Sequence, residues 1–236
     1  MYHRAQAGPY GNPPAMLDAH FAYLARHCRC VLPGEPLADS RVKVCLIFDD
    51  AYFDFYSVVF PLLEKHNLRS MLAVSPGLVH EQAVFSNTTR THTGGAVGLT
   101  QGYDDGYCTW GELATLAASG RVAIAAHGYN HAPLDCQEID LDTEIKLPQV
   151  MLSARLGQRV DSFVFPYGRF SAPAVRKVRE HYRYAFRIGG AANRDWSGSL
   201  LYRVDGDRMA SPDALFKPAR LAVFRARYHW NRLRGR

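Results

Sequence analysis

An apolar run from Val42 to Phe48 ends directly in two adjacent carboxylates, Asp49 and Asp50. The run is rich in β-branched and bulky residues, which predicts one buried strand over residues 42–48. In an α/β protein, ligands and catalytic groups gather at the carboxyl ends of strands. Two neighbouring acids there are costly unless a metal or a division of their pKa values compensates them, although Asp is also a common helix N-cap. The pair alone leaves both interpretations open.

Further apolar segments alternate with amphipathic helical patterns. Such alternation favours a parallel α/β architecture, either a barrel or an open sheet. Pro148 must kink or split its helix because proline cannot donate the helical hydrogen bond. We expect the long polar stretch 80–108 to shape a substrate groove. Strands are expected at 70–74, 122–126, 160–165 and 184–188, with a short apolar piece at 200–204, and helices at 15–28, 54–66, 109–120, 140–156 and 173–182.

The composition is that of an ordinary soluble globular protein, with 47% hydrophobic and 21% charged residues in a chain of 236. No repeat or linker divides it, so we expect a single domain over residues 1–216. The five cysteines are scattered and odd in number, and neither a signal peptide nor a membrane-spanning run is visible. These features predict a cytoplasmic location, where thiols stay reduced.

The basic excess is concentrated in residues 217–236, which hold seven Lys or Arg residues and no acid. The rest of the chain is close to neutral, so nucleic acid is not an expected partner. The tail interleaves its arginines with Leu, Val, Phe, Tyr and Trp, a pattern suited to an anionic membrane surface. Peripheral contact with the inner membrane through this tail is therefore one interpretation, and a solvated or disordered tail is the one that we favour.

Two histidines follow the strand expected at 122–126. His127 and His131 are four residues apart, so both rings can reach one ion if the segment turns helically. A carboxylate with two imidazoles makes an open-sided metal site that leaves positions free for water and substrate. A second carboxylate beside it would be placed to act as a general base. The histidine spacing alone is a weak signal, and its combination with the acid pair is stronger.

Three motifs in order carry a resemblance to a known family. They are Ile47-Phe48-Asp49-Asp50-Ala51, then His127 to His131, then Phe165-Pro166-Tyr167-Gly168. The chain resembles the polysaccharide deacetylases, metal-dependent carbohydrate N-deacetylases with Thr-Phe-Asp-Asp-Gly, His-x-x-x-His and Pro-Tyr-Gly motifs, over most of residues 2–205. The resemblance implies an α/β fold of the family's type, an incomplete, distorted (β/α) barrel.

The resemblance also implies roles for individual residues. Asp49 would be the general base, and Asp50, His127 and His131 would bind one divalent metal ion, with zinc expected and nickel, cobalt or iron as alternatives. Tyr167 would help to stabilise the oxyanion through its backbone N–H. The implied substrate is an N-acetylated amino sugar or oligosaccharide, soluble or lipid-linked, in bacterial surface polysaccharide or glycolipid biosynthesis.

The chain departs from the family pattern at three places, and two of these departures leave the proton donor open. Ala51 replaces the first-motif glycine, which fits only if this position does not need a positive φ. The third motif lacks its arginine, and no late Leu-x-His motif supplies the general acid. The opening Tyr2-His3 matches a subgroup resembling the poly-N-acetylglucosamine deacetylases, which makes His3 the candidate acid, with a disordered terminal histidine as the alternative.

Arg203 is a further candidate on the substrate and oxyanion side. It lies in a Leu-Tyr-Arg-Val piece that resembles a late strand of the family, where it would orient the base, although a solvated arginine is what we expect. Two competing functions remain open at this point. One is removal of a formyl or another acyl group from an amino sugar, and the other is glycan binding without efficient catalysis.

Overall fold

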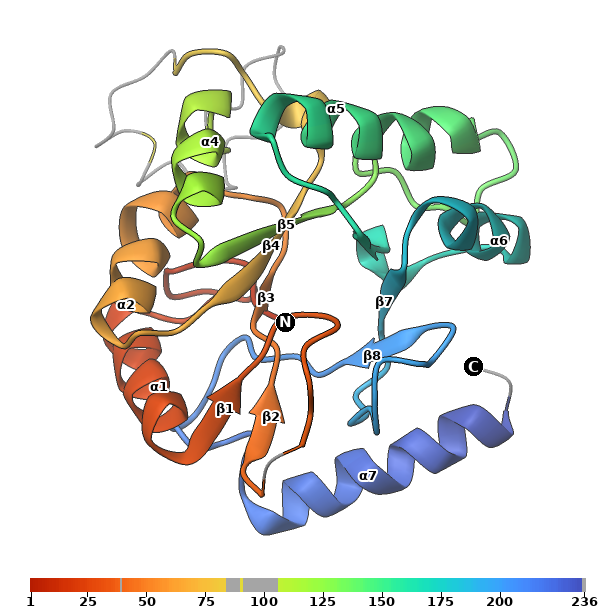
Figure 1. Cartoon of the computed structure of the whole chain (residues 1–236). Helices are drawn as coiled ribbons and strands as arrows, with labels where there is room; N and C mark the ends of the chain where they lie inside the picture. The colour runs from red at the N-terminus through yellow and green to blue at the C-terminus, as the bar shows by residue number, and fades with distance from the viewer. Residues whose placement is uncertain (39, 84–89, 91–105, 235–236) are drawn as a thin grey trace.

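The computed structural model describes residues 1–38, 40–83, 90 and 106–234, and its centre is a sheet of six parallel strands (Figure 1). The strands lie side by side in chain order, so every connection crosses back to begin the next strand at the same end of the sheet. All six carboxyl ends therefore meet at one edge. The strands are β3 (Ile47–Phe48), β4 (Ser70–Val74), β5 (Val122–Ala126), β6 (Ser162–Val164), β7 (Tyr184–Ile188) and β8 (Leu201–Arg203).

The sheet forms a half-barrel whose first and last strands do not pair, and residues 1–3 lie in the seam between them. The Tyr2 N–H donates to the Ile47 carbonyl at 2.9 Å, and the Asp49 N–H donates to the Tyr2 carbonyl at 2.9 Å. On the other side, the Gly206 N–H donates to the Met1 carbonyl at 2.9 Å. The fold is thus the incomplete, distorted (β/α) barrel that the resemblance implied.

The run from Val42 to Phe48 is not one strand, and this prediction was wrong. Val42–Val44 forms β2, which pairs with β1 (Cys28–Cys30) in a separate two-stranded sheet. The chain then passes to the main sheet, where β3 pairs with β4. Apolar, β-branched composition identifies an extended run, but the hydrogen-bond partners come from strands distant in sequence.

Helices lie around the outside of the half-barrel, with α1, α2 and α4 on one side in Figure 1 and α5 and α6 on the other. All five cysteines are free thiols. The α-helices of the barrel are α1 (Pro14–His27), α2 (Phe60–Lys65), α4 (Trp110–Ala118), α5 (Leu147–Leu156) and α6 (Ala172–His181), and the shorter turns are η1 (Phe55–Val59), η2 (Pro76–Leu78), η3 (Asp142–Lys146) and η4 (Pro166–Gly168).

Two of the predicted helices, 54–66 and 140–156, are divided just before a proline. The π-helical turn η1 precedes α2, whose second residue is Pro61, and the π-helical turn η3 precedes α5, whose second residue is Pro148. Proline has no N–H for the ordinary helical bond, so it is best placed in the first turn of a new segment. The division at Pro148 was predicted, and the one at Pro61 has the same cause.

Most of the polar stretch 80–108, which we expected to shape a groove, lies outside the described residues (84–89 and 91–105). Where description resumes, α4 begins at the predicted cap. The Thr109 side chain accepts from the Glu112 N–H at 3.3 Å, and the Glu112 carboxylate accepts from the Thr109 N–H at 2.7 Å. Just before it, Tyr107 stacks on Tyr52 with ring centroids 5.1 Å apart. The end of the stretch therefore reaches the carboxyl edge of the sheet.

Most of the predicted C-terminal tail is the helix α7 (Pro218–Leu233), which runs along the bottom of the view in Figure 1. The Phe224 carbonyl accepts from the Ala192 N–H at 3.0 Å, and the Asn231 side chain donates to the Gly189 carbonyl at 3.1 Å. These bonds attach one face of α7 to the body of the protein. Within the described ranges, no helix combines the length and the apolar character needed to cross a bilayer.

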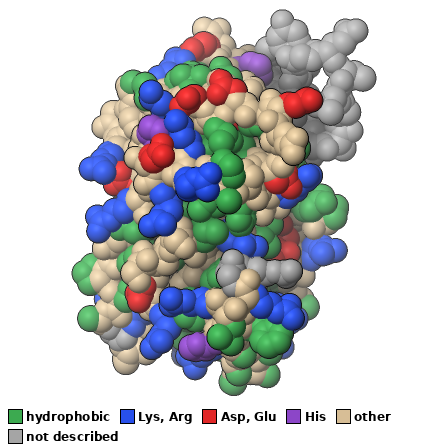
Figure 2. All heavy atoms as spheres, turned by 90° about the vertical axis from the view of Figure 1, so that its right-hand side faces the viewer, with side chains coloured by type: hydrophobic (Ala, Val, Ile, Leu, Met, Phe, Trp, Pro, Cys, Tyr) green, Lys and Arg blue, Asp and Glu red, His purple; other side chains and the backbone are tan. Residues whose placement is uncertain are grey.

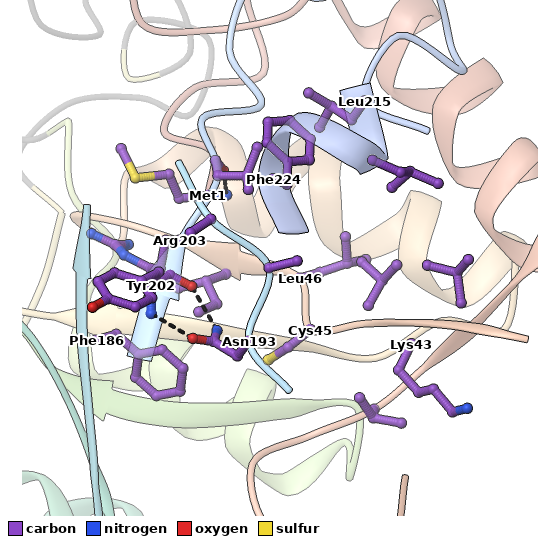
Figure 3. Close-up of a pocket in the computed structure, with 18 of the residues that line it drawn as sticks. Met1, Lys43, Cys45, Leu46, Phe186, Asn193, Tyr202, Arg203, Leu215 and Phe224 are labelled. Atoms are coloured by element: carbon purple, nitrogen blue, oxygen red, sulfur yellow. Dashed lines mark hydrogen bonds between the residues drawn. The ribbon is translucent and has the colours of Figure 1, made fainter. Parts of the chain in front are cut away.

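A mainly apolar cavity of about 230 Å³ lies in the seam, between β2–β3 and β8 (Figure 3). Leu46, Phe186 and Phe224 contribute to its lining. At its wall, Asn193 donates to the Tyr202 carbonyl at 2.8 Å and accepts from the Tyr202 N–H at 2.9 Å, as the dashed lines show (Figure 3). These bonds attach the β7–β8 connection to β8 at the wall of the cavity.

A second asparagine, Asn12, makes a similar pair of hydrogen bonds in a fully buried position. It donates to the Gly206 carbonyl at 2.8 Å and accepts from the Met209 N–H at 2.8 Å. We predict that Asn12→Ala lowers the free energy of unfolding by about 2–4 kcal/mol, because two buried backbone groups lose their partners. Urea denaturation followed by circular dichroism measures the loss.

The matched control is Asn193→Ala, which removes the same two kinds of bond from a half-buried position. Water can replace the lost partners there, so the expected loss is only about 1 kcal/mol. Equal losses in the two variants would contradict the argument from burial.

Candidate active site

Asp49 and Arg203 meet at the carboxyl ends of the first and last strands. Nη1 of Arg203 lies 2.6 and 2.8 Å from the two carboxylate oxygens of Asp49, and the residues are only 4% and 3% exposed. The expectation of a solvated Arg203 was wrong, because the curl of the sheet turns the end of β8 toward β3. Burial raises the pKa of Asp49, but attraction to Arg203, His127 and His3 outweighs it and holds that pKa below its ordinary value. Asp49 is an ionised, oriented carboxylate.

The next residue, Asp50, lies against the two histidines of the second motif. Its Oδ1 is 3.1 Å from Nε2 of His131 and 3.5 Å from Nε2 of His127, and the two Nε2 atoms are 3.2 Å apart. Two nitrogens that bind one ion at about 2.0–2.1 Å in tetrahedral geometry are separated by about 3.3 Å. Burial raises the pKa of Asp50, but its interactions with both histidines lower that pKa further than burial raises it. The three side chains thus fit a divalent metal ion.

The orientation of His127 is fixed by its other ring nitrogen. Nδ1 lies 2.7 Å from the carbonyl oxygen of Val164, at the end of β6. A carbonyl can only accept, so Nδ1 carries the proton and the Nε2 lone pair is left for a metal. On His131, Nδ1 lies 3.1 Å from the hydroxyl of Tyr167. The end of β6 and the turn η4 after it thus contact both imidazoles, and the Val164 carbonyl prepares His127 as a ligand.

The loop that carries the two histidines is organised by the buried carboxylate of Glu144, from η3. This carboxylate accepts from the Tyr129 N–H at 2.9 Å, from the Asn130 N–H at 3.2 Å and from the Asn130 side chain at 3.0 Å. A Cβ on Gly128, where φ is +76°, would lie 2.8 Å from the same carboxylate. Sequence reasoning missed Glu144, because nothing distinguishes it from other acids of a helical pattern.

Several residues of the site adopt left-handed backbone conformations. Asp50, Ala51, His131 and Tyr167 have φ of 73°, 55°, 58° and 56°. The condition set for Ala51, that its position does not need a positive φ, is therefore not met. An L-residue pays about 1–2 kcal/mol for this conformation, and glycine does not. The motif loops thus hold strained residues, as functional sites commonly do.

His3 lies on the Asp49 side of the site. Its Nε2 is 3.8 Å from Oδ2 of Asp49, and its Nδ1 is 2.5 Å from Oδ2 of Asp207. Burial lowers the pKa of His3, but the hydrogen bond to Asp207 and the charges of Asp49 and Asp207 raise it above its ordinary value. The structure thus places this residue inside the site rather than in a disordered terminus. Asp207 was missed, although an Asp-Gly-Asp turn directly after an expected strand could have signalled it.

The candidate residues share one cavity of about 560 Å³ at the carboxyl edge. Its lining includes all of the predicted site residues, namely His3, Asp49, Asp50, His127, His131, Tyr167 and Arg203. The Tyr167 side chain is 59% exposed at the rim. Tyr10, Tyr52 and Tyr107 add aromatic surface, which gives the mixed polar and apolar lining typical of a small-molecule site. All seven residues predicted for the site therefore come together, while their roles stay predictions.

The polysaccharide deacetylase family model matches residues 38–185. This chain belongs to that family. The matched range contains Asp49, Asp50, the two histidines and Tyr167, whereas His3 and Arg203 lie outside it. Comparison with curated protein sequences gives no match.

Solved structures of deacetylases share the fold of this polysaccharide deacetylase. The Streptococcus pyogenes deacetylase PplD in complex with acetate is 19% identical, with a TM-score of 0.72 over 92% of this chain and 95% of that chain. IcaB from Ammonifex degensii is 18% identical, with a TM-score of 0.69 over 94% of each chain. A de-N-acetylase from Aggregatibacter actinomycetemcomitans is 16% identical, with a TM-score of 0.71 over 94% and 97%. At these identities the likeness establishes the fold.

We predict that one divalent metal ion binds through Asp50, His127 and His131 and stabilises the folded protein. At a free ion concentration of about 100 times Kd, binding adds about 2.7 kcal/mol to the free energy of unfolding. Thermal unfolding of the metal-free protein with added zinc should show a clear rise in Tm. The variant His131→Ala should show little or no rise, whereas Tyr167→Phe, which keeps all three ligands, should respond as the wild type does. A rise of equal size in His131→Ala would contradict the assignment.

We further predict that Glu144→Ala lowers zinc affinity by about tenfold, because the loop that presents His131 loses its buried acceptor. Glu144→Gln keeps one acceptor oxygen and should lose less. Competition with a chromogenic chelator measures both affinities. Unchanged affinity in Glu144→Ala would show that the loop holds its shape without the carboxylate.

Proposed function

We propose that this polysaccharide deacetylase hydrolyses the N-acetyl amide of an amino sugar, in the biosynthesis of a bacterial surface polysaccharide or glycolipid. The observation that carries the proposal is a single cavity in which the Asp50–His127–His131 cluster lies beside an ionised Asp49. One solved protein of similar fold is named a de-N-acetylase. That name supports the amide bond of the N-acetyl group as the bond that is broken.

Asp50, His127 and His131 would hold one divalent ion, and we propose zinc, which binds imidazole and carboxylate ligands and keeps an open position in catalytic sites. Such an ion supplies Lewis acidity, which polarises the amide carbonyl and makes water more acidic. The acidity matters to this chain because its base is weak. A carboxylate whose pKa is held down by Arg203 can take a proton readily only from an acidic donor.

Asp49 accepts the proton of the attacking water, and Arg203 holds the carboxylate in the orientation to receive it. The hydroxyl adds to the amide carbon, and the backbone N–H of Tyr167 is proposed to donate to the oxyanion. The carbon–nitrogen bond then breaks, and the leaving amine takes a proton to give acetate and the free amino sugar. His3 is the proposed donor, because Asp207 orients its ring toward Asp49 and its raised pKa favours the protonated form.

The cavity also suits a sugar in its dimensions and lining. About 560 Å³ accommodates one or two sugar rings, and tyrosine rings offer flat apolar surfaces to the C–H faces of such rings. The mouth of the cavity has Tyr167 at its rim, so a ring could enter while the remainder of a longer substrate stays outside. An oligosaccharide, soluble or lipid-linked, is therefore the proposed substrate.

The test measures acetate released from N-acetylglucosamine oligosaccharides by the zinc-loaded protein. We expect Asp49→Asn to lower kcat by about 10²–10⁴-fold, since a general base contributes this much. His3→Ala should lower it by about 10²-fold and should reduce the loss of activity at high pH that follows deprotonation of the acid. The control His27→Ala, at the exposed end of α1, should leave the rate unchanged.

Three outcomes would count against the proposal in different ways. Release of formate from N-formyl sugars, with no acetate from N-acetyl sugars, would favour the alternative acyl group. Oligosaccharide binding without release of any acid would favour a glycan-binding protein. Full activity in Asp49→Asn would remove Asp49 from the mechanism.

A further inference from the structure

The outward face of α7 is apolar, although it packs against no other part of the described chain. Six exposed residues recur at the spacing of one helical face, namely Ala219, Ala222, Val223, Ala226, Trp230 and Leu233. The larger three are 42%, 54% and 83% exposed (Val223, Trp230 and Leu233). A surface helix normally presents polar residues on this side. The stripe therefore lacks an explanation in the packing of the protein.

The opposite face of α7 packs against the body of the protein. Leu221, Phe224, Tyr228 and Asn231 recur at the same helical spacing and are buried or half-buried. Leu221 and Phe224 line the seam cavity (Figure 3), and Asn231 bonds to the Gly189 carbonyl. Because this inner face attaches the helix, the outer stripe is not needed to hold α7 in place. It is available for a partner.

Arginines border the outer stripe on both sides. With 3.6 residues per turn, Arg225 and Arg232 lie along one border, and Arg220, Arg227 and Arg234 lie along the other. The helix contains no acid, and none of these five arginines forms an ion pair with an acid elsewhere among the described residues. Figure 2 views the molecule toward the C-terminal end of α7 and shows basic and hydrophobic side chains together at its lower end. The partner must therefore offer both apolar depth and negative charge.

We propose that α7 binds the surface of an anionic lipid bilayer, with its axis parallel to the surface. The outer stripe would enter the boundary between headgroups and acyl chains, and the bordering arginines would contact lipid phosphates. Trp230 is the residue type that prefers this boundary. A second copy of this chain fits the face less well, because a symmetric contact would bring the two arginine borders together and repel. The proposal rests on α7 alone and does not depend on the deacetylase reaction.

The test uses the full chain and measures co-sedimentation with vesicles of phosphatidylcholine, with and without phosphatidylglycerol. We expect binding to the anionic vesicles that weakens as salt is added, with a blue shift of tryptophan emission. Trp230 dominates this shift because it is 54% exposed, whereas Trp110 is 6% exposed and Trp196 is half-buried, with its indole N–H donating to the Glu35 carbonyl. The variant Arg225→Gln/Arg232→Gln should bind about 25-fold more weakly, at about fivefold for each arginine.

A second variant, Trp230→Ser/Leu233→Ser, removes apolar depth without changing charge and should weaken binding by at least about tenfold. Its matched control is Leu147→Ser/Val150→Ser, which changes two exposed apolar residues of α5, 37% and 56% exposed, and should bind as the wild type does. All variants should release acetate from a soluble sugar at the wild-type rate. If the wild type itself releases no acetate, that result bears on the proposed function and not on the membrane contact.

The proposal is overturned if the wild type does not bind anionic vesicles or binds neutral vesicles equally well. It is also overturned if the α5 variant loses as much binding as the α7 variants. A wild-type dimer that becomes a monomer in Trp230→Ser, without vesicle binding, would assign the stripe to a second copy of this chain. Light scattering coupled to size-exclusion chromatography makes this distinction.

Discussion

The buried ion pair between Asp49 and Arg203 depends on the shape of the entire half-barrel. The two residues end strands that are not paired with each other, so their side chains meet only because the sheet curls. A buried charge is tolerated when its partner is in contact, and is strongly destabilising when the partner is removed. The pair therefore links the reactive carboxylate to the closure of the fold. The residues in the seam benefit from the same closure, since Tyr2 bridges to Phe48 and brings His3 to the rim of the cavity.

The metal side of the site is held by different means. His127 is at the end of a buried strand, and a strand-end carbonyl fixes its ring. His131 is in a loop, where a left-handed backbone and the buried Glu144 carboxylate together set its position. Local strain of this kind persists when surrounding contacts determine the conformation. One histidine is thus positioned by regular structure and the other by a hydrogen-bond network, which makes the loop the more sensitive part of the site.

Much of the fold and most of the site could be predicted from the sequence. The parallel α/β alternation, the cap at Thr109 and the break at Pro148 follow from local chemistry, and the structure confirms them. The predictions that were wrong concern partners in space. The run 42–48 is divided between two sheets, and Arg203 is buried, because strand partners and the curl of a sheet depend on residues far away in the sequence. Glu144 escaped notice for the same reason, whereas the Asp-Gly-Asp turn could have signalled Asp207.

The sequence by itself determined which residues could do chemistry, because two acids after an apolar run, two histidines four apart and a Pro-Tyr-Gly turn follow one another in the order of the family's motifs. It also determined the amphipathic character of α7, since helical periodicity is a property of consecutive residues. The resemblance had assigned Asp50 to the histidines, but only the tertiary structure decided that Asp49 faces a buried arginine. It alone decided that one apolar face of α7 packs inward while the other stays exposed. Both outcomes depend on where distant segments lie, and no local pattern of residues contains that information.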